Sequence, residues 1–67
     1  MNNIKKINYS VEIGASIKEA MLCIDSNMKG TCFITVGKKL VGMVTDGDIR
    51  RAILKGVSIN ENIEKIM

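Results

Sequence analysis

The chain alternates between segments with helical spacing of apolar residues and short continuous apolar runs. A first helix is predicted from Ser16, because Ser16 and Glu19 match a capping box in which each side chain accepts from the other's backbone N–H. Gly30 is placed to end this helix in a left-handed conformation. The apolar face comprises Ile17, Ala20, Met21, Ile24 and Met28, and the polar positions include Asp25, Ser26, Asn27 and Lys29.

A second helix is predicted from residue 46 or 47 to residue 55, and Gly56 stops it. Its buried stripe is expected to comprise Ile49, Ala52 and Ile53. A third helical piece is expected to start within residues 58–61. It would carry the apolar residues Ile59, Ile63, Ile66 and Met67.

Two short runs between the helices predict a β-hairpin. Residues 31–36 are rich in β-branched side chains, residues 40–44 form the second strand, and residues 37–39 make a tight connection. Gly42 removes a side chain in mid-strand and so permits close approach of a ligand or another backbone. With a further short strand within residues 7–13, the order predicts a two-layer α+β fold, a small sheet packed on two helices.

Composition extends this picture to the surface. With 67 residues, the chain is a single domain that buries only about 60% of its unfolded surface. An apolar fraction of 46% is large for this length, so part of it is expected to stay exposed in the monomer. Because an exposed apolar face usually marks a partner surface, the composition indicates an oligomer or a piece of a longer protein.

Charge and cysteine usage argue against several kinds of site. The net charge of +3 comes from scattered basic residues, with no run typical of a nucleic-acid-binding tail. There is no His, and Cys23 and Cys32 have neither zinc-site nor CxxC spacing, so we expect buried free thiols in a reducing cytoplasm. No apolar stretch approaches the roughly 20 residues that span a bilayer, so no membrane partner is expected.

The junction of the second strand and the second helix carries the densest chemistry. Thr45, Asp46, Gly47 and Asp48 combine a hydroxyl, two carboxylates and free backbone N–H groups, which suit a phosphate and a ribose. Without a ligand, the same residues fit a capping box, with Asp46 as an alternative N-cap. The Asp46 carboxylate would repel an anion unless a cation or Arg51 neutralised it. No catalytic or metal-binding constellation accompanies them, which favours a binding module over an enzyme.

Residues 42–51, GMVTDGDIRR, resemble the signature of the CBS domain, which reads Gly, hydrophobic, any, Thr or Ser, any, any, Asp or Asn. The likeness extends over nearly all of residues 1–67, as a single CBS repeat. It implies that two such units pair through their sheets into a Bateman-type module, with adenosine nucleotides bound in the clefts between them. On this resemblance Thr45 contacts phosphate, Asp48 contacts the ribose and Met43 helps to line the base pocket.

A narrower likeness concerns the parent protein. The run TDGDIRRAI followed by Gly-Val-Ser is similar to CBS pairs attached to bacterial sugar nucleotidyltransferases and arabinose-5-phosphate isomerases. The lead-in at residues 4–7 favours the N-terminal repeat of a nucleotidyltransferase. Residues 3–7 also echo residues 62–66, so residues 63–67 look like the start of a linker into a second repeat, although a match over a five-residue stretch also arises by chance.

The resemblance implies a regulatory module that binds AMP, ADP, ATP or S-adenosylmethionine non-covalently and acts on an attached catalytic domain in the cytoplasm. Arg50 and Arg51 are further phosphate candidates, which no motif position fixes. The lead at residues 7–16 lacks the Pro usual in the family and the hairpin turn is short, so the ligand stays open. The alternative is a ligand-free module that forms a homodimer through its apolar strand faces. Nucleic-acid binding is a weaker third class.

Overall fold

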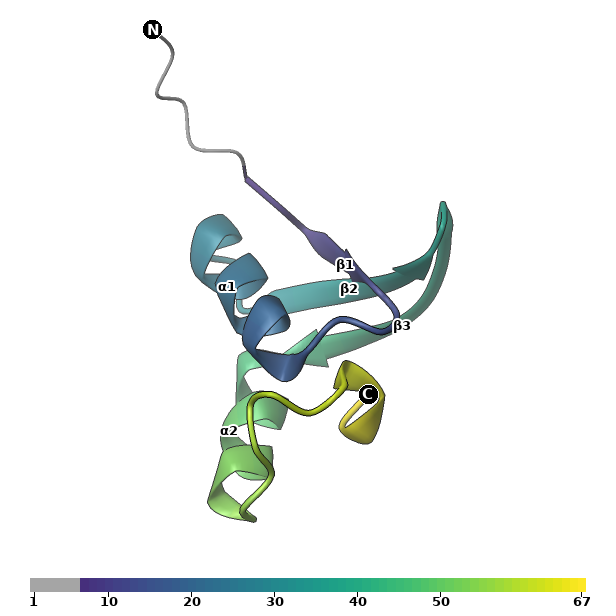
Figure 1. The fold of residues 1–67 in the computed structure, drawn as a ribbon. Helices are drawn as coiled ribbons and strands as arrows, with labels where there is room; N and C mark the ends of the chain where they lie inside the picture. The colour runs from purple at the N-terminus through teal and green to yellow at the C-terminus, as the bar shows by residue number, and fades with distance from the viewer. Residues whose placement is uncertain (1–6) are drawn as a thin grey trace, which may run out of the picture.

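The computed structural model describes residues 7–67, which form a three-stranded sheet with two helices on one of its faces (Figure 1). The short strand β1 (Ser10–Glu12) pairs in parallel with β2 (Thr31–Val36), and β2 pairs antiparallel with β3 (Lys39–Thr45). The two-layer α+β prediction is confirmed, including the short strand within residues 7–13. Residues 4–7, which favoured a nucleotidyltransferase, and residues 3–7, which echo residues 62–66, lie almost entirely outside the described residues.

The helix α1 (Ile17–Asn27) connects β1 to β2 and begins at the predicted N-cap, where Ser16 Oγ accepts from the Glu19 N–H at 3.1 Å. Its end was predicted wrongly. Met28, not Gly30, is the left-handed residue that closes the helix, with φ 56°. Met28 is also 87% exposed, so it does not belong to the apolar face.

A buried amide explains this early end. The Asn27 side chain donates to the carbonyls of Asn8 and Thr31 at 2.9 and 3.1 Å, and its Oδ1 accepts from the Lys29 N–H at 2.7 Å. Asn27 is therefore only 6% exposed, although it was predicted on the polar face. Each of its bonds joins the end of α1 to a neighbouring segment, so the helix stops where these segments meet.

The helix α2 (Asp46–Leu54) begins at the residue after β3 ends. Ile49 and Ala52 are buried as predicted: Ile49 belongs to the core cluster, and Ala52 lies against residues 57–67. Ile53 was predicted in the same stripe but is 43% exposed. Gly56, at φ 90°, follows the C-cap residue Lys55 and turns the chain back, as its predicted role as a helix stop requires.

Residues 57–67, which we call the C-terminal segment, return across the start of α1. The N–H groups of Ile17 and Lys18 donate to the carbonyls of Glu61 and Ile59 at 2.9 and 2.8 Å, and the Ile63 N–H donates to the Ala15 carbonyl at 2.8 Å. The carbonyls of Ile59 and Glu61 accept from α1 and not from a following helical turn, so the predicted third helix does not start within residues 58–61. The only helical turn of residues 57–67 is η1 (Ile63–Lys65), a single 3-10 turn.

The core lies between the helices and the sheet. The largest fully buried side chains are Ile17, Ile34, Ile63, Val44 and Cys32. Cys23 and Cys32 are buried free thiols, as predicted. Burial, together with the neighbouring thiol of Cys23, raises the pKa of Cys32 to about 12.

Gly42 is a point of close approach, as its position in mid-strand predicts. It pairs with Ile34 of β2, and a Cβ added at Gly42 would lie 2.6 Å from Cε of Met67. The nearest neighbour within residues 7–67 is therefore a side chain from the C-terminal segment and not a backbone. The absence of a side chain at Gly42 lets the C-terminal segment rest against β3.

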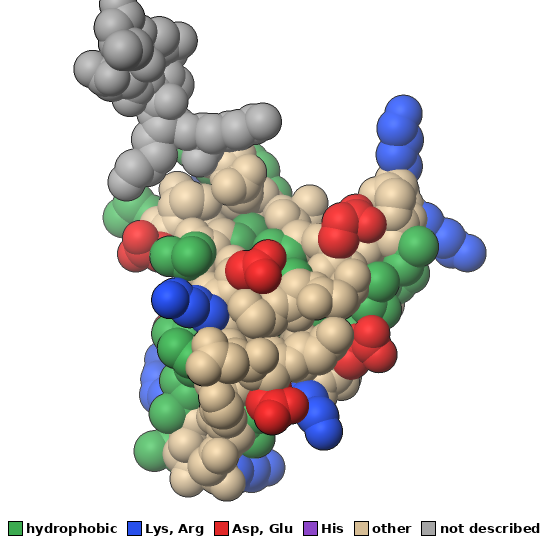
Figure 2. Space-filling view, viewed as in Figure 1, with side chains coloured by type: hydrophobic (Ala, Val, Ile, Leu, Met, Phe, Trp, Pro, Cys, Tyr) green, Lys and Arg blue, Asp and Glu red, His purple; other side chains and the backbone are tan. Residues whose placement is uncertain are grey.

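The face of the sheet opposite the helices carries apolar side chains. Phe33 and Met43 are cross-strand partners on this face, and Met43 is 51% exposed. Leu40 and Val41, further along β3, are exposed as well. We call these four residues the outer sheet face. Hydrophobic side chains also gather beside the cationic side chains at the end of the β2–β3 hairpin in Figure 2. In the part of the chain that the structure describes, no helix has the length and hydropathy to cross a bilayer.

Candidate functional site

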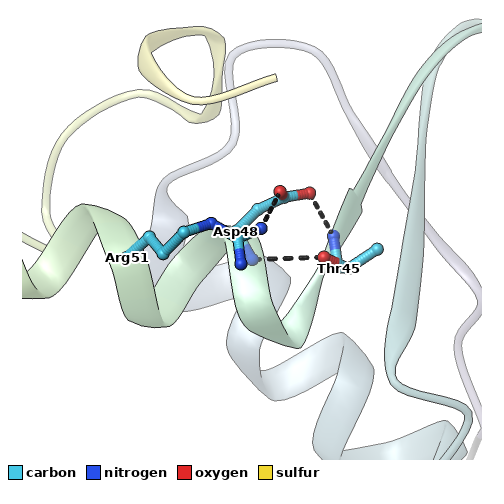
Figure 3. A network of polar contacts seen from close by, with 3 residues as sticks. All are labelled: Thr45, Asp48 and Arg51. Carbon is cyan, nitrogen blue, oxygen red and sulfur yellow. Dashed lines mark hydrogen bonds and ion pairs between the residues drawn. The ribbon is translucent and has the colours of Figure 1, made fainter.

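The junction between β3 and α2 is built around Thr45 and Asp48. Thr45 has an extended backbone, so its hydroxyl turns toward the helix and Oγ1 accepts from the Asp48 N–H at 3.1 Å. In return, Asp48 Oδ2 accepts from the Thr45 N–H at 2.9 Å (Figure 3). The capping box predicted from the sequence is confirmed. Asp46 as an alternative N-cap is wrong, because Thr45 occupies that position.

Arg51 completes this network from the next turn of α2. Its Nη2 donates to Asp48 Oδ1 at 2.8 Å (Figure 3). The Thr45 backbone N–H, the Thr45 side chain and the Arg51 guanidinium, in that order, lower the pKa of Asp48 from its ordinary value. Asp48 is therefore a fixed, ionised acceptor at neutral pH.

Gly47 makes room for the arginine. A Cβ added at Gly47 would lie 3.2 Å from Nη1 of Arg51, closer than nearly all such contacts. The glycine therefore lets the Arg51 guanidinium lie over the first turn of α2. None of residues 7–67 accepts a hydrogen bond from the Gly47 N–H, whereas the Asp46 N–H donates to the Gly30 carbonyl at 2.9 Å.

Asp46 is directed away from this network. Its Oδ2 accepts from Arg50 Nη2 at 3.0 Å, and its side chain borders an apolar groove between α1 and Ile59. The cation that neutralises Asp46 is therefore Arg50. The sequence left a cation or Arg51 open for this role, and Arg51 pairs with Asp48 instead.

Asp48 and Arg51 border a pocket of about 260 Å³ between α2 and the C-terminal segment. The other lining residues are Ala52, Lys55, Val57, Lys65 and Ile66. Sequence reasoning missed both lysines. Lys55 could have been found, because it lies four residues after Arg51 and thus on the same helix face. Lys65 has no local signal, since it reaches the pocket only through the return of the C-terminal segment.

The structure thus brings together three of the predicted site residues, Thr45, Asp48 and Arg51, with Gly47 beside them. Met43 lies apart from them on the outer sheet face and does not border the pocket. Within residues 7–67, no three His, Cys, Asp or Glu side chains come together in a group that could hold a metal ion.

Comparisons with known proteins identify the fold but show no family. No protein-family model matches the chain. Two uncharacterized proteins of Helicobacter pylori, from strains ATCC 700392 / 26695 and J99 / ATCC 700824, are 37% and 34% identical over 49 and 50 residues. These matches cover 72% and 73% of the chain, which spans about 15% of the length of each relative.

A solved structure resembles nearly the whole domain. It is the crystal structure of a cystathionine beta-synthase (CBS) domain protein fused to a Zn-ribbon-like domain. The TM-score is 0.77 at 23% sequence identity, and the match covers 87% of this chain and 86% of that one. The chain therefore has the fold of a CBS domain.

Proposed function

We propose that the chain is a regulatory CBS module that binds an adenine nucleotide at the start of α2, as one repeat of a longer protein. The observation that carries the proposal is the network of Thr45, Asp48 and Arg51, of which Asp48 and Arg51 border a pocket, within a CBS fold. The module itself is not an enzyme. It acts in the cytoplasm on an attached catalytic domain.

Asp48 is suited to hold the ribose. Each of its two oxygens accepts one hydrogen bond within the domain, from Thr45 and from Arg51. A carboxylate has about four acceptor positions, so two stay open to the paired hydroxyls of a ribose. The Thr45 backbone N–H and side chain lower the pKa of Asp48, so its carboxylate stays ionised. An ionised carboxylate forms strong, charge-assisted hydrogen bonds with the ribose hydroxyls.

Three groups beside Asp48 are suited to a phosphate. The Thr45 hydroxyl uses a lone pair to accept from Asp48 N–H, which leaves its own proton free to donate. The Gly47 N–H points out of the first turn of α2, where the helix dipole favours an anion. Arg51 adds a guanidinium that shares its charge with Asp48.

A single copy forms only part of the site. A pocket of about 260 Å³ lies below the roughly 300–1,000 Å³ of typical ligand sites. Met43, the proposed base contact, belongs to the exposed outer sheet face, so it needs a second unit to enclose a base. We propose that a second CBS unit, from the same longer chain or from a second copy, packs on the outer sheet face.

Regulation then follows from differential binding. A nucleotide that prefers one arrangement of the paired units shifts the attached domain toward that arrangement. Since the chain matches only about 15% of each relative, most of such a protein lies elsewhere. We propose a sugar-phosphate nucleotidyltransferase as the attached enzyme, with an arabinose-5-phosphate isomerase as the alternative.

Isothermal titration calorimetry with AMP, ADP, ATP and S-adenosylmethionine tests this proposal. Asp48→Asn is expected to weaken nucleotide binding about ten- to a hundredfold, the equivalent of roughly 1.5–3 kcal/mol. Asp46→Asn is the matched control, because it removes the same charge two residues away, at a side chain that pairs with Arg50 outside the Asp48 network, and is expected not to weaken binding. Equal affinities of Asp48→Asn and the parent, or no binding of any adenosine compound, would contradict the proposal.

The outer sheet face supports a second candidate, a ligand-free dimerisation module. Phe33 and Met43 form an apolar cross-strand pair that nothing within residues 7–67 covers. Analytical ultracentrifugation of the chain alone is expected to show a dimer, and Phe33→Glu a monomer. A dimer that binds no adenosine compound would favour this candidate. A parent chain that stays monomeric would exclude it.

A further inference from the structure

The pocket beside Asp48 collects cations from two separate elements. Arg51 and Lys55 lie one turn apart on α2, and Lys65 comes from η1 across the pocket. Asp48 is the one carboxylate in the lining, and it already pairs with Arg51 at 2.8 Å. The lining therefore has an excess of positive charge.

The two lysine charges have no partner among the described residues. Within residues 7–67, the ion pairs are Arg50 with Asp46 and Arg51 with Asp48, and neither lysine takes part in one. A cation at the C-cap stabilises a helix end, which explains Lys55 alone. It does not explain why Lys65, from a different element, borders the same pocket.

Lys65 is held there by the structure around it. The adjacent turn is anchored by Ile63, which is fully buried and whose N–H donates to the Ala15 carbonyl at 2.8 Å. Asn62 caps the turn, since its Oδ1 accepts from the Glu64 N–H at 2.8 Å. The backbone that presents Lys65 is thus fixed, which reduces the entropy lost when its ammonium binds an anion.

We propose that Arg51, Lys55 and Lys65 form a polyphosphate subsite, which makes this module select nucleoside di- and triphosphates over monophosphates. The inference rests on the proposed function for the adenosine half of the ligand. From Asp48 to Lys55 the helix rises about 10 Å, and Arg51 lies between them, so a phosphate chain that starts at the Thr45 hydroxyl and the Gly47 N–H would pass Arg51 before it reaches the two lysines. Each added phosphate brings negative charge next to one more unpaired ammonium. The same excess of positive charge disfavours S-adenosylmethionine, which is a cation.

Titration calorimetry of the whole chain at fixed ionic strength tests the subsite. ATP is expected to bind about tenfold or more tightly than AMP, with ADP between them and S-adenosylmethionine weakest. The double variant Lys55→Gln/Lys65→Gln is expected to bring the affinity for ATP close to that for AMP while AMP binding changes little. The double variant Lys38→Gln/Lys39→Gln, at the hairpin, removes the same net charge and is expected to keep the preference for ATP.

Inorganic tripolyphosphate separates the phosphate chain from the nucleotide. It is expected to bind the parent chain and to lose affinity in Lys55→Gln/Lys65→Gln. Equal affinities for ATP and AMP, or an ATP preference that survives in this variant, would overturn the subsite. If Asp48→Asn still weakened all adenosine ligands equally, the proposed function would stand. If tripolyphosphate bound through the lysines as tightly as ATP, the subsite would stand and the nucleotide assignment would fail.

Discussion

The two helices of the domain start with the same hydroxyl cap, and yet only one start is open. Ser16 caps α1 and Thr45 caps α2, each with its hydroxyl oxygen 3.1 Å from the backbone nitrogen three residues on. At α1, the C-terminal segment covers the start, where its carbonyls accept from the N–H groups of Ile17 and Lys18. At α2, no described residue accepts from the Gly47 N–H, and Asp48, in the first turn, borders a pocket.

The difference shows that the capping motif fixes where a helix begins but does not make a binding site. A site also needs a start that the chain leaves uncovered. At α1 the backbone donors are used inside the domain, whereas at α2 the Gly47 N–H has no acceptor within residues 7–67 and Asp48 borders a pocket that also holds two unpaired lysines. We therefore expect changes at α1 to affect folding alone and changes at α2 to affect ligand binding too.

The largest effect on stability is expected from truncating Ile63, the buried side chain that holds the C-terminal segment against the start of α1. Ile63→Ala truncates a fully buried side chain and is expected to cost about 2–5 kcal/mol of unfolding free energy. A domain of this size has only about 3–5 kcal/mol in total, so much of the protein would unfold. Urea denaturation followed by circular dichroism measures this. Leu54→Ala, at an exposed position, is the control and should change the stability by less than about 0.5 kcal/mol.

A smaller and more selective effect is expected from the two caps. Ser16→Ala and Thr45→Ala should each lower the unfolding free energy by about 1 kcal/mol, because each removes a helix N-cap. Only Thr45→Ala should also weaken nucleotide binding, and Thr45→Ser should restore it, since the hydroxyl is kept. Parallel urea and calorimetric titrations check the pair. The comparison between the two starts breaks down if Ser16→Ala weakens binding as much as Thr45→Ala does.

The smallest effect is expected on the free energy of unfolding at low pH. The Thr45 backbone N–H, the Thr45 side chain and Arg51 lower the native-state pKa of Asp48, so the ionised carboxylate stabilises the fold above about pH 4, the ordinary Asp value. That stabilisation is lost as the pH falls below this value and through the native-state pKa. Urea titrations from pH 7 to about pH 2 should therefore show a smaller acid loss for Asp48→Asn than for the parent.

Glu12 supplies an independent reference for this acid effect. Its pKa is also lowered, first by the Gly37 N–H and then by the Thr35 hydroxyl, and neither group belongs to a helix start. Glu12→Gln should remove its own share of the acid loss without altering the share that Asp48 contributes. Identical acid profiles of the parent and Asp48→Asn would show that the carboxylate is not held as the geometry indicates.

Local signals in the sequence predicted the parts of the fold that depend on neighbouring residues. Helical spacing and the Ser16 and Thr45 caps set both helix starts, and β-branched runs set the hairpin. The end of α1 depends on the Asn27 amide, whose partners at Asn8 and Thr31 are brought there by tertiary structure. No periodicity in the sequence could indicate that bond.

In the candidate site too, the sequence predicted contacts between residues that are close in the chain but not the long-range ones. Thr45 and Asp48 are close in the chain, so their contact followed from the capping motif. Which arginine pairs with which carboxylate depends on side-chain direction, and Arg51, one of the two neutralising groups that the sequence left open for Asp46, pairs with Asp48 instead. Lys65 reaches the pocket through the packing of η1, a long-range contact that only the structure shows.

The buried thiols make the layer between α1 and the sheet open to direct kinetic measurement. Cys23 lies on α1 and Cys32 on β2, so a thiol reagent reaches Cys32 only when these two elements separate. With its pKa raised to about 12, the Cys32 thiol is almost entirely protonated at neutral pH and reacts only after such an opening. The chain has no Trp whose fluorescence could report unfolding. Its own cysteines can report opening instead, and the rate of their modification measures how often α1 and the sheet separate.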